Sequence, residues 1–120
     1  MTTLRLGDET VDLSRRILIV DPTNEDFDAQ LGAAGVVELG TPTVATLSQL
    51  PERFASGEAV AMTFSQGQLP ELALAVVRGC RIVRTDDVEA ATKVCRMIEA
   101  ILDAEMLERQ RLEHQRLEEE

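Results

Sequence analysis

Short aliphatic runs alternate with segments of helical periodicity along this chain, and that alternation limits its fold more than any other feature. The aliphatic runs predict strands at residues 17–20, 35–40, 59–64 and 82–84. Helical patterns follow them at residues 25–34, 42–55, 69–78 and from 86 onward. Such alternation is typical of a parallel sheet with right-handed crossovers. Short strands at residues 4–6 and 10–13 flank Gly7-Asp8 and predict an N-terminal hairpin. The predicted fold class is therefore α/β, with a β-hairpin followed by (βα)4.

The composition agrees with a sheet that is buried on both faces. The chain has 120 residues, a normal length for one domain, and 44% of them are hydrophobic. Only 2% are aromatic, so the core must be built from Val, Leu, Ile and Ala. Small aliphatic residues of this kind suit strands that are covered by helices.

The C-terminal helix has the strongest pattern in the chain and then loses it. An apolar stripe runs from Val88 to Leu102, and Asp86 with Glu89 forms a pair typical of a capping box. Beyond Ala104 a five-residue repeat rotates around the helix, so no continuous apolar seam forms. We therefore expect a domain over residues 1–104 and a charged tail over 105–120, either helical or frayed.

Charge and residue usage exclude several classes of function. The formal net charge of −10 argues against binding to nucleic acid or to an anionic membrane. No stretch is apolar enough to span a bilayer and the N-terminus lacks a signal-peptide core, so a cytoplasmic protein is expected. Cys80 and Cys95 lack metal-ligand spacing and are predicted to be buried, reduced thiols. His114 is the only histidine, which excludes a His-based triad within this chain.

Three segments resemble dihydropteroate synthases. Residues 4–14, LRLGDETVDLS, are similar to the N-terminal hairpin of that family. Residues 19–27, IVDPTNEDF, resemble the first-strand motif IVNxTPDSF, and residues 79–88, GCRIVRTDDV, resemble the last-strand motif GAxIxRVHDV. Residues 34–40 and 61–67 are weaker matches to the second and seventh strands.

This resemblance implies a shortened barrel. Synthases of the family are eight-stranded TIM barrels, which need about 250 residues. The chain has room for half of that sheet, namely the first, second, seventh and eighth strands. Numbered along this chain, its parallel strands are expected in the order 2-1-4-3. A half-barrel would expose its inner face, so the resemblance also predicts a homo-oligomer, a dimer in which a second copy covers that face.

The resemblance also implies that synthase chemistry is lost. Asp21 stands where the family has a magnesium-associated Asn, and Gln66 and Gly67 replace an Arg and a Lys. Arg84 keeps the last-strand Arg, whereas Asp86 replaces a His. A diphosphate site with these changes lacks the positive groups that would stabilise the leaving oxygens. We expect no synthase activity from this chain alone.

Four residues remain as a candidate ligand site: Asp21, Ser65, Arg84 and Asp86. Asp21 and Asp86 could also bind Mg²⁺ together with Asp87, although no cofactor is required. Structural roles stay open as well: Arg84 could pair with Asp21 or Asp86, Asp86 could be a helix N-cap, and Ser65 could belong to a plain loop.

The predicted function is a non-catalytic, dihydropteroate-synthase-like binding or interaction protein. It would associate with itself, with a full-length synthase or with another folate enzyme. One alternative is a protein that binds a pterin-like or phosphorylated small molecule through Asp21, Arg84 and Asp86. A metal-assisted enzyme with altered chemistry is the other alternative.

Overall fold

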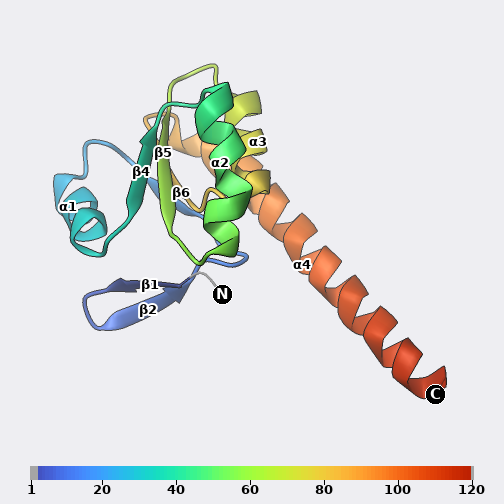
Figure 1. Ribbon diagram of the computed structural model, residues 1–120. Helices are drawn as coiled ribbons and strands as arrows, with labels where there is room; N and C mark the ends of the chain where they lie inside the picture. Colours follow the sequence, from blue (N-terminus) through green and yellow to red (C-terminus); the bar gives the residue numbers. More distant parts are fainter. Residues whose placement is uncertain (1–2, 120) are drawn as a thin grey trace.

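A four-stranded parallel sheet forms the centre of the computed structural model, which describes residues 3–119 (Figure 1). A hairpin precedes the sheet, and a long helix follows it. The elements in chain order are β1 (Thr3–Leu6), β2 (Glu9–Asp12), β3 (Leu18–Val20), α1 (Glu25–Ala33), β4 (Val37–Gly40), α2 (Val44–Ala55), β5 (Val60–Phe64), α3 (Leu69–Arg78), β6 (Ile82–Thr85) and α4 (Val88–Glu119). The predicted α/β class, hairpin, parallel strands and long C-terminal helix are confirmed.

The strand order differs from the prediction at one strand. The observed order is β3-β6-β5-β4, whereas the predicted order 2-1-4-3 corresponds to β4-β3-β6-β5. The pairing of β6 with β3 and with β5 is as expected, but β4 pairs with β5 at the opposite edge. The physical reason is that consecutive strands tend to lie side by side, as β4 and β5 do across α2 and β5 and β6 do across α3. Only the connection from β3 to β4, through α1, passes from one edge of this sheet to the other.

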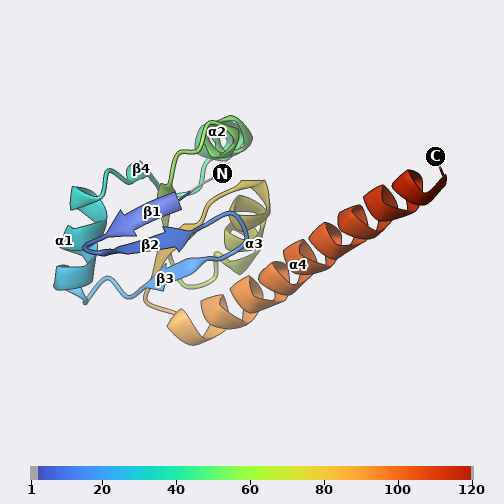
Figure 2. The same ribbon diagram turned by 90° about the horizontal axis from the view of Figure 1, so that it is seen from below.

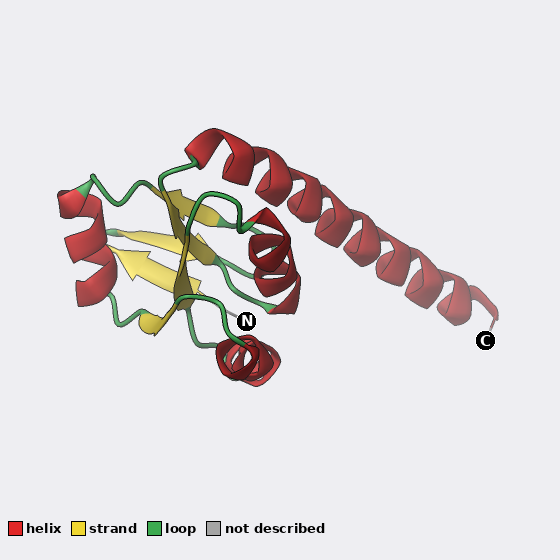
Figure 3. Cartoon of the chain, turned by 90° about the horizontal axis from the view of Figure 1, so that it is seen from above, coloured by secondary structure: helices red, strands yellow, loops and turns green. Residues whose placement is uncertain are grey.

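Helices cover both faces of the sheet. Figure 3 shows α1 on one face and α2, α3 and α4 on the other. The side chains of β5 alternate accordingly: Met62 and Phe64 point to the three-helix face, and Ala61 points to the α1 face. On that second face Leu31 of α1 is packed with Leu4 and Leu13 from the hairpin region. The exposed inner face expected of a half-barrel is therefore covered by this chain itself.

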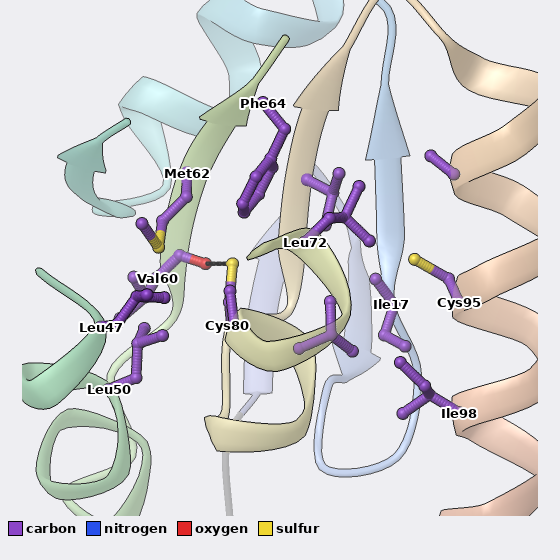
Figure 4. Close-up of a cluster of buried hydrophobic side chains, with 14 residues drawn as sticks. Ile17, Leu47, Leu50, Val60, Met62, Phe64, Leu72, Cys80, Cys95 and Ile98 are labelled. Atoms are coloured by element: carbon purple, nitrogen blue, oxygen red, sulfur yellow. Dashed lines mark hydrogen bonds between the residues drawn. The ribbon is translucent and has the colours of Figure 1, made fainter. Parts of the chain in front are cut away.

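The larger core cluster lies between the sheet and the three helices (Figure 4). Its members are aliphatic or contain sulfur, except for Phe64, which agrees with the low aromatic content of the chain. The labelled residues are Ile17, Leu47, Leu50, Val60, Met62, Phe64, Leu72, Cys80, Cys95 and Ile98. Both cysteines are fully buried and free, which confirms the prediction of reduced thiols. The Sγ atom of Cys80 lies 3.4 Å from the Ile82 carbonyl and 3.7 Å from that of Val60.

Neither thiol should react in the folded protein. Burial raises the pKa of Cys80 to about 12 and that of Cys95 to about 11, so almost no thiolate forms near pH 8. A disulfide reagent such as DTNB should leave both thiols unmodified in the native protein and modify both after denaturation. A rapid native reaction of either thiol would show that its surroundings open on the time scale of the assay.

Helix α4 has 32 residues and extends well beyond the rest of the domain (Figures 1 and 2). Ala91, Cys95 and Ile98 are buried, whereas every residue from 104 to 116 is exposed. Of the two expected states of the tail, the helical one is observed. The prediction that Asp86 is the N-cap of α4 is wrong by one residue. The N-cap is Asp87, because its carbonyl accepts the first helical N–H, from Ala91, at 3.1 Å.

Candidate functional site

Three of the four predicted site residues lie together at the carboxyl end of the sheet. Asp21 follows β3, Asp86 follows β6 and Ser65 follows β5, and these strands are adjacent and parallel. They line a pocket of about 340 Å³, which we call the β3–β6 crevice. Its full lining is Asp21, Pro22, Thr23, Thr63, Phe64, Ser65 and Asp86.

The course of the chain explains why a crevice forms here. After β3 the chain turns to α1 on one face, and after β6 it turns to α4 on the other (Figure 3). Adjacent strands whose connections leave in opposite directions open a crevice between their carboxyl ends. In open α/β sheets this is the usual place for a bound ligand.

The crevice presents carboxylate oxygens. One Asp21 oxygen accepts hydrogen bonds from the backbone N–H and the hydroxyl of Thr23, both at 2.9 Å. These bonds lower the pKa of Asp21, so it is charged at neutral pH. Among the described residues, no side chain forms a hydrogen bond or an ion pair with the carboxylate of Asp86. The lining also contains no Lys or Arg, so it favours a ligand that donates hydrogen bonds over an anionic one.

The backbone of Ser65 is already hydrogen-bonded within its own loop. Its backbone N–H donates to the side-chain oxygen of Gln68 at 2.8 Å, and the Gln68 N–H donates back to the Ser65 carbonyl at 3.1 Å. The loop thereby satisfies the amide that could have bound an anion. The Ser65 side chain remains part of the crevice lining.

Arg84 does not join the crevice. Along β6, Val83 points to the three-helix face, so Arg84 points to the α1 face. There it forms an ion pair with Glu38 of β4, and its side chain is only 12% exposed. The expected pairing of Arg84 with Asp21 or Asp86 is therefore wrong, because strand alternation places its side chain on the other side of the sheet.

The crevice does not assemble a larger set of metal ligands. Asp21 and Asp86 both line it. Within residues 3–119, however, no group of three or more His, Cys, Asp or Glu side chains comes together as a metal site would require. Asp87, the expected third ligand, is not part of the lining.

The sequence analysis did not predict the burial of two charged residues, Arg81 and Glu99. Glu99 of α4 accepts the backbone N–H of Ile17 at 2.9 Å and forms an ion pair with Arg96. Arg81 is 2% exposed and donates to three backbone carbonyls. Glu99 lies in a helix rich in exposed charges, and Arg81 occupies a position at which the last-strand motif accepts any residue. Neither pattern signals burial.

Comparison with known proteins identified no match among family models or curated proteins. The resemblance to dihydropteroate synthases thus rests on the motifs alone. Within the described part of the chain, no helix combines the length and the apolar character that a membrane crossing requires.

Proposed function

We propose that this chain is a non-catalytic binding protein that holds a small, pterin-like molecule in the β3–β6 crevice. The observation that carries the proposal is the meeting of Asp21, Ser65 and Asp86 in one pocket between strands whose connections diverge. The pocket volume of about 340 Å³ lies within the range of small-molecule sites.

The charge of the lining favours a pterin-like ligand over a phosphorylated one. Two carboxylates with no lining cation would repel a phosphorylated molecule. The same carboxylates would accept hydrogen bonds from amino and ring N–H groups, which a pterin presents along one edge. A metal-assisted enzyme would need ligands beyond Asp21 and Asp86.

We also propose that the chain is a shortened relative of dihydropteroate synthases and that it is located in the cytoplasm. In an eight-stranded barrel the first strand neighbours the eighth, and the eighth neighbours the seventh. The contacts of β3 with β6 and of β6 with β5 agree with that arrangement. The position of β4 does not, so the proposed half-barrel origin requires that this strand changed edges.

Calorimetric titration with a matched pair of ligands tests the proposal. Pterin carries an exocyclic amino group, and lumazine has a carbonyl oxygen in its place. We expect pterin to bind at least about tenfold more tightly than lumazine, because a hydrogen bond to a carboxylate contributes about 1.5–3 kcal/mol. Asp86→Asn should weaken this preference, since a neutral amide oxygen accepts less strongly than a carboxylate, whereas Asp87→Asn, outside the lining, should keep it. Equal binding of the two ligands by the wild-type protein would contradict the proposal.

Self-association is a second candidate function. Leu74 and Val77 of α3 and Met97 and Ile101 of α4 are exposed apolar side chains on two helices that pack against each other. A second copy is the proposed occupant of this surface, and a full-length folate enzyme is the other partner to which the resemblance points. Light scattering at micromolar concentration should give a dimer that Ile101→Glu dissociates and Gln110→Glu does not. A monomeric wild-type protein would rule this candidate out.

A further inference from the structure

A second pocket lies at the opposite, amino-terminal end of the sheet. Its volume is about 310 Å³, and we call it the Arg81 pocket. The lining comes from the segment before β3, the ends of α2 and α3, the start of β6 and the part of α4 that leaves the domain. The residues are Ser14, Arg15, Phe54, Val77, Arg81, Leu102, Glu105, Met106 and Arg109.

Arg81 is the unusual member of this lining, because a buried charge normally has a charged partner. Its Nη1 atom donates to the carbonyls of Val76 at 2.6 Å and Cys80 at 3.3 Å. Its Nη2 atom donates only to the Ser14 carbonyl, at 3.3 Å. The Nε–H is buried without an acceptor, and no described carboxylate forms an ion pair with the guanidinium.

The groups around Arg81 leave its positive charge in place. The Phe54 ring lies 4.7 Å from the guanidinium carbon, a cation–π contact that stabilises the charge without neutralising it. Burial lowers the pKa of Arg81, because the guanidinium has lost solvation, and the negative charge of Glu99 offsets only part of this effect. An anion in the adjoining pocket would restore part of that lost stabilisation.

The charged residues of the whole lining carry a net positive charge. Three arginines, Arg15, Arg81 and Arg109, face one acidic residue, Glu105. Arg15 is paired with Asp103 at 3.0 Å, whereas Arg109 forms no ion pair within the described residues. A locally positive pocket is unexpected on a chain whose formal net charge is −10.

The pocket also has an apolar wall. Its apolar lining residues are Phe54, Val77, Leu102 and Met106. Val77 is largely exposed, Leu102 is half-buried, and Met106 belongs to the exposed part of α4. A ligand that fits both features has an anionic head and an apolar body.

We propose that the Arg81 pocket binds a small organic anion, a carboxylate or phosphate monoester attached to an aliphatic or aromatic body. The anionic group lies among Arg15, Arg81 and Arg109, where charge-assisted hydrogen bonds are the strongest available. The apolar body lies against Phe54 and the side chains of α4. This site is independent of the β3–β6 crevice, since the two pockets share no lining residue.

Titration of the full chain with hexanoate and 1-hexanol, followed by two-dimensional NMR at constant ionic strength, tests the proposal. The two probes differ in the charged head and share an apolar chain. Hexanoate at millimolar concentration should shift the amide resonances of Ser14, Val77, Leu102 and Met106. It should bind at least about tenfold more tightly than hexanol, since its head forms charge-assisted bonds. Inorganic phosphate alone should bind more weakly than hexanoate, because it lacks the apolar body.

Substitutions on α4 separate a specific site from general attraction. Arg81 is buried, and Arg81→Met could fail to fold, so the exposed Arg109 is the better position. Arg109→Glu should weaken hexanoate binding about tenfold. Arg111→Glu is the matched control: it changes the charge equally, but Arg111 is paired with Glu108 and lies outside the lining. Absence of hexanoate binding, equal binding of hexanol, or equal effects of the two variants would overturn the proposal.

Discussion

Replacing Gly79 with alanine should destabilise the protein by about 3 kcal/mol or more, a large share of the total stability of a small domain. Gly79 ends α3 with a φ of +121°, a conformation that side chains with a Cβ rarely adopt. A Cβ placed there would also lie 2.5 Å from the Cβ of Phe54 and 2.8 Å from its Cγ. Those Phe54 atoms are close to the α2 backbone, so a rotamer change alone cannot relieve the overlap.

Urea unfolding of Gly79→Ala and Gly35→Ala separates the two causes. Gly35 also has a positive φ, +81°, but a Cβ added there would meet nothing within 4 Å. Gly35→Ala should therefore cost about 1 kcal/mol, the backbone strain alone. Equal losses for the two variants would show that Phe54 does not approach Gly79 as closely as described, and the position of the Phe54 ring over Arg81 would then be in doubt as well.

Removing the Glu99 carboxylate should have the second largest effect, about 2–4 kcal/mol. Glu99 is buried and accepts the N–H of Ile17, which lies just before β3. The Glu99→Ala variant would leave that buried N–H without an acceptor, a loss of about 1–3 kcal/mol, and would add a cavity beside the core. One of the links between α4 and the segment that leads into β3 would be lost with it, while the Arg15–Asp103 ion pair would remain.

Two further variants test this assignment by the same unfolding measurement. Glu99→Gln keeps an oxygen that can accept the Ile17 N–H and should recover most of the stability. Arg96→Gln removes the half-exposed partner of the ion pair and should cost about 1 kcal/mol or less. If Glu99→Gln were as unstable as Glu99→Ala, the negative charge rather than the hydrogen bond to Ile17 would be the important feature.

The sequence was sufficient for the local elements and for part of the sheet. Hydrophobic periodicity and turn residues predicted the hairpin, the strands and the helices. The resemblance to dihydropteroate synthases predicted that β6 lies between β3 and β5, as it does. That central pairing is why Asp21, Ser65 and Asp86 were correctly expected at one edge of the sheet. The position of β4 was not predictable in this way, because its four residues include an exposed Glu38 and have no pattern that indicates which strand they pair with.

The charged residues were harder to place than the strands. Whether Arg84 meets Asp21 or Glu38 depends on which face of β6 its side chain occupies and on which strand lies beyond β5. Arg81 and Glu99 are buried because segments far apart in the sequence close over them. Such closure depends on tertiary contacts, and composition and periodicity do not contain it.

Together these features describe a small sheet with a distinct pocket at each end. The carboxyl end presents the oxygens of Asp21 and Asp86, and the amino end presents the guanidinium groups around Arg81. The two ends should thus prefer ligands of opposite character, a hydrogen-bond donor at one and an anion at the other.

If the β3–β6 crevice is a binding site, an NMR titration of the wild-type chain with pterin should detect the bound ligand there. We predict saturable shifts of the amide resonances of Asp21, Thr23, Ser65 and Asp86, while Ser14 and Met106 in the Arg81 pocket stay unchanged. No saturable shift of the crevice resonances at millimolar pterin, or shifts confined to other regions, would show that the β3–β6 crevice does not bind pterin.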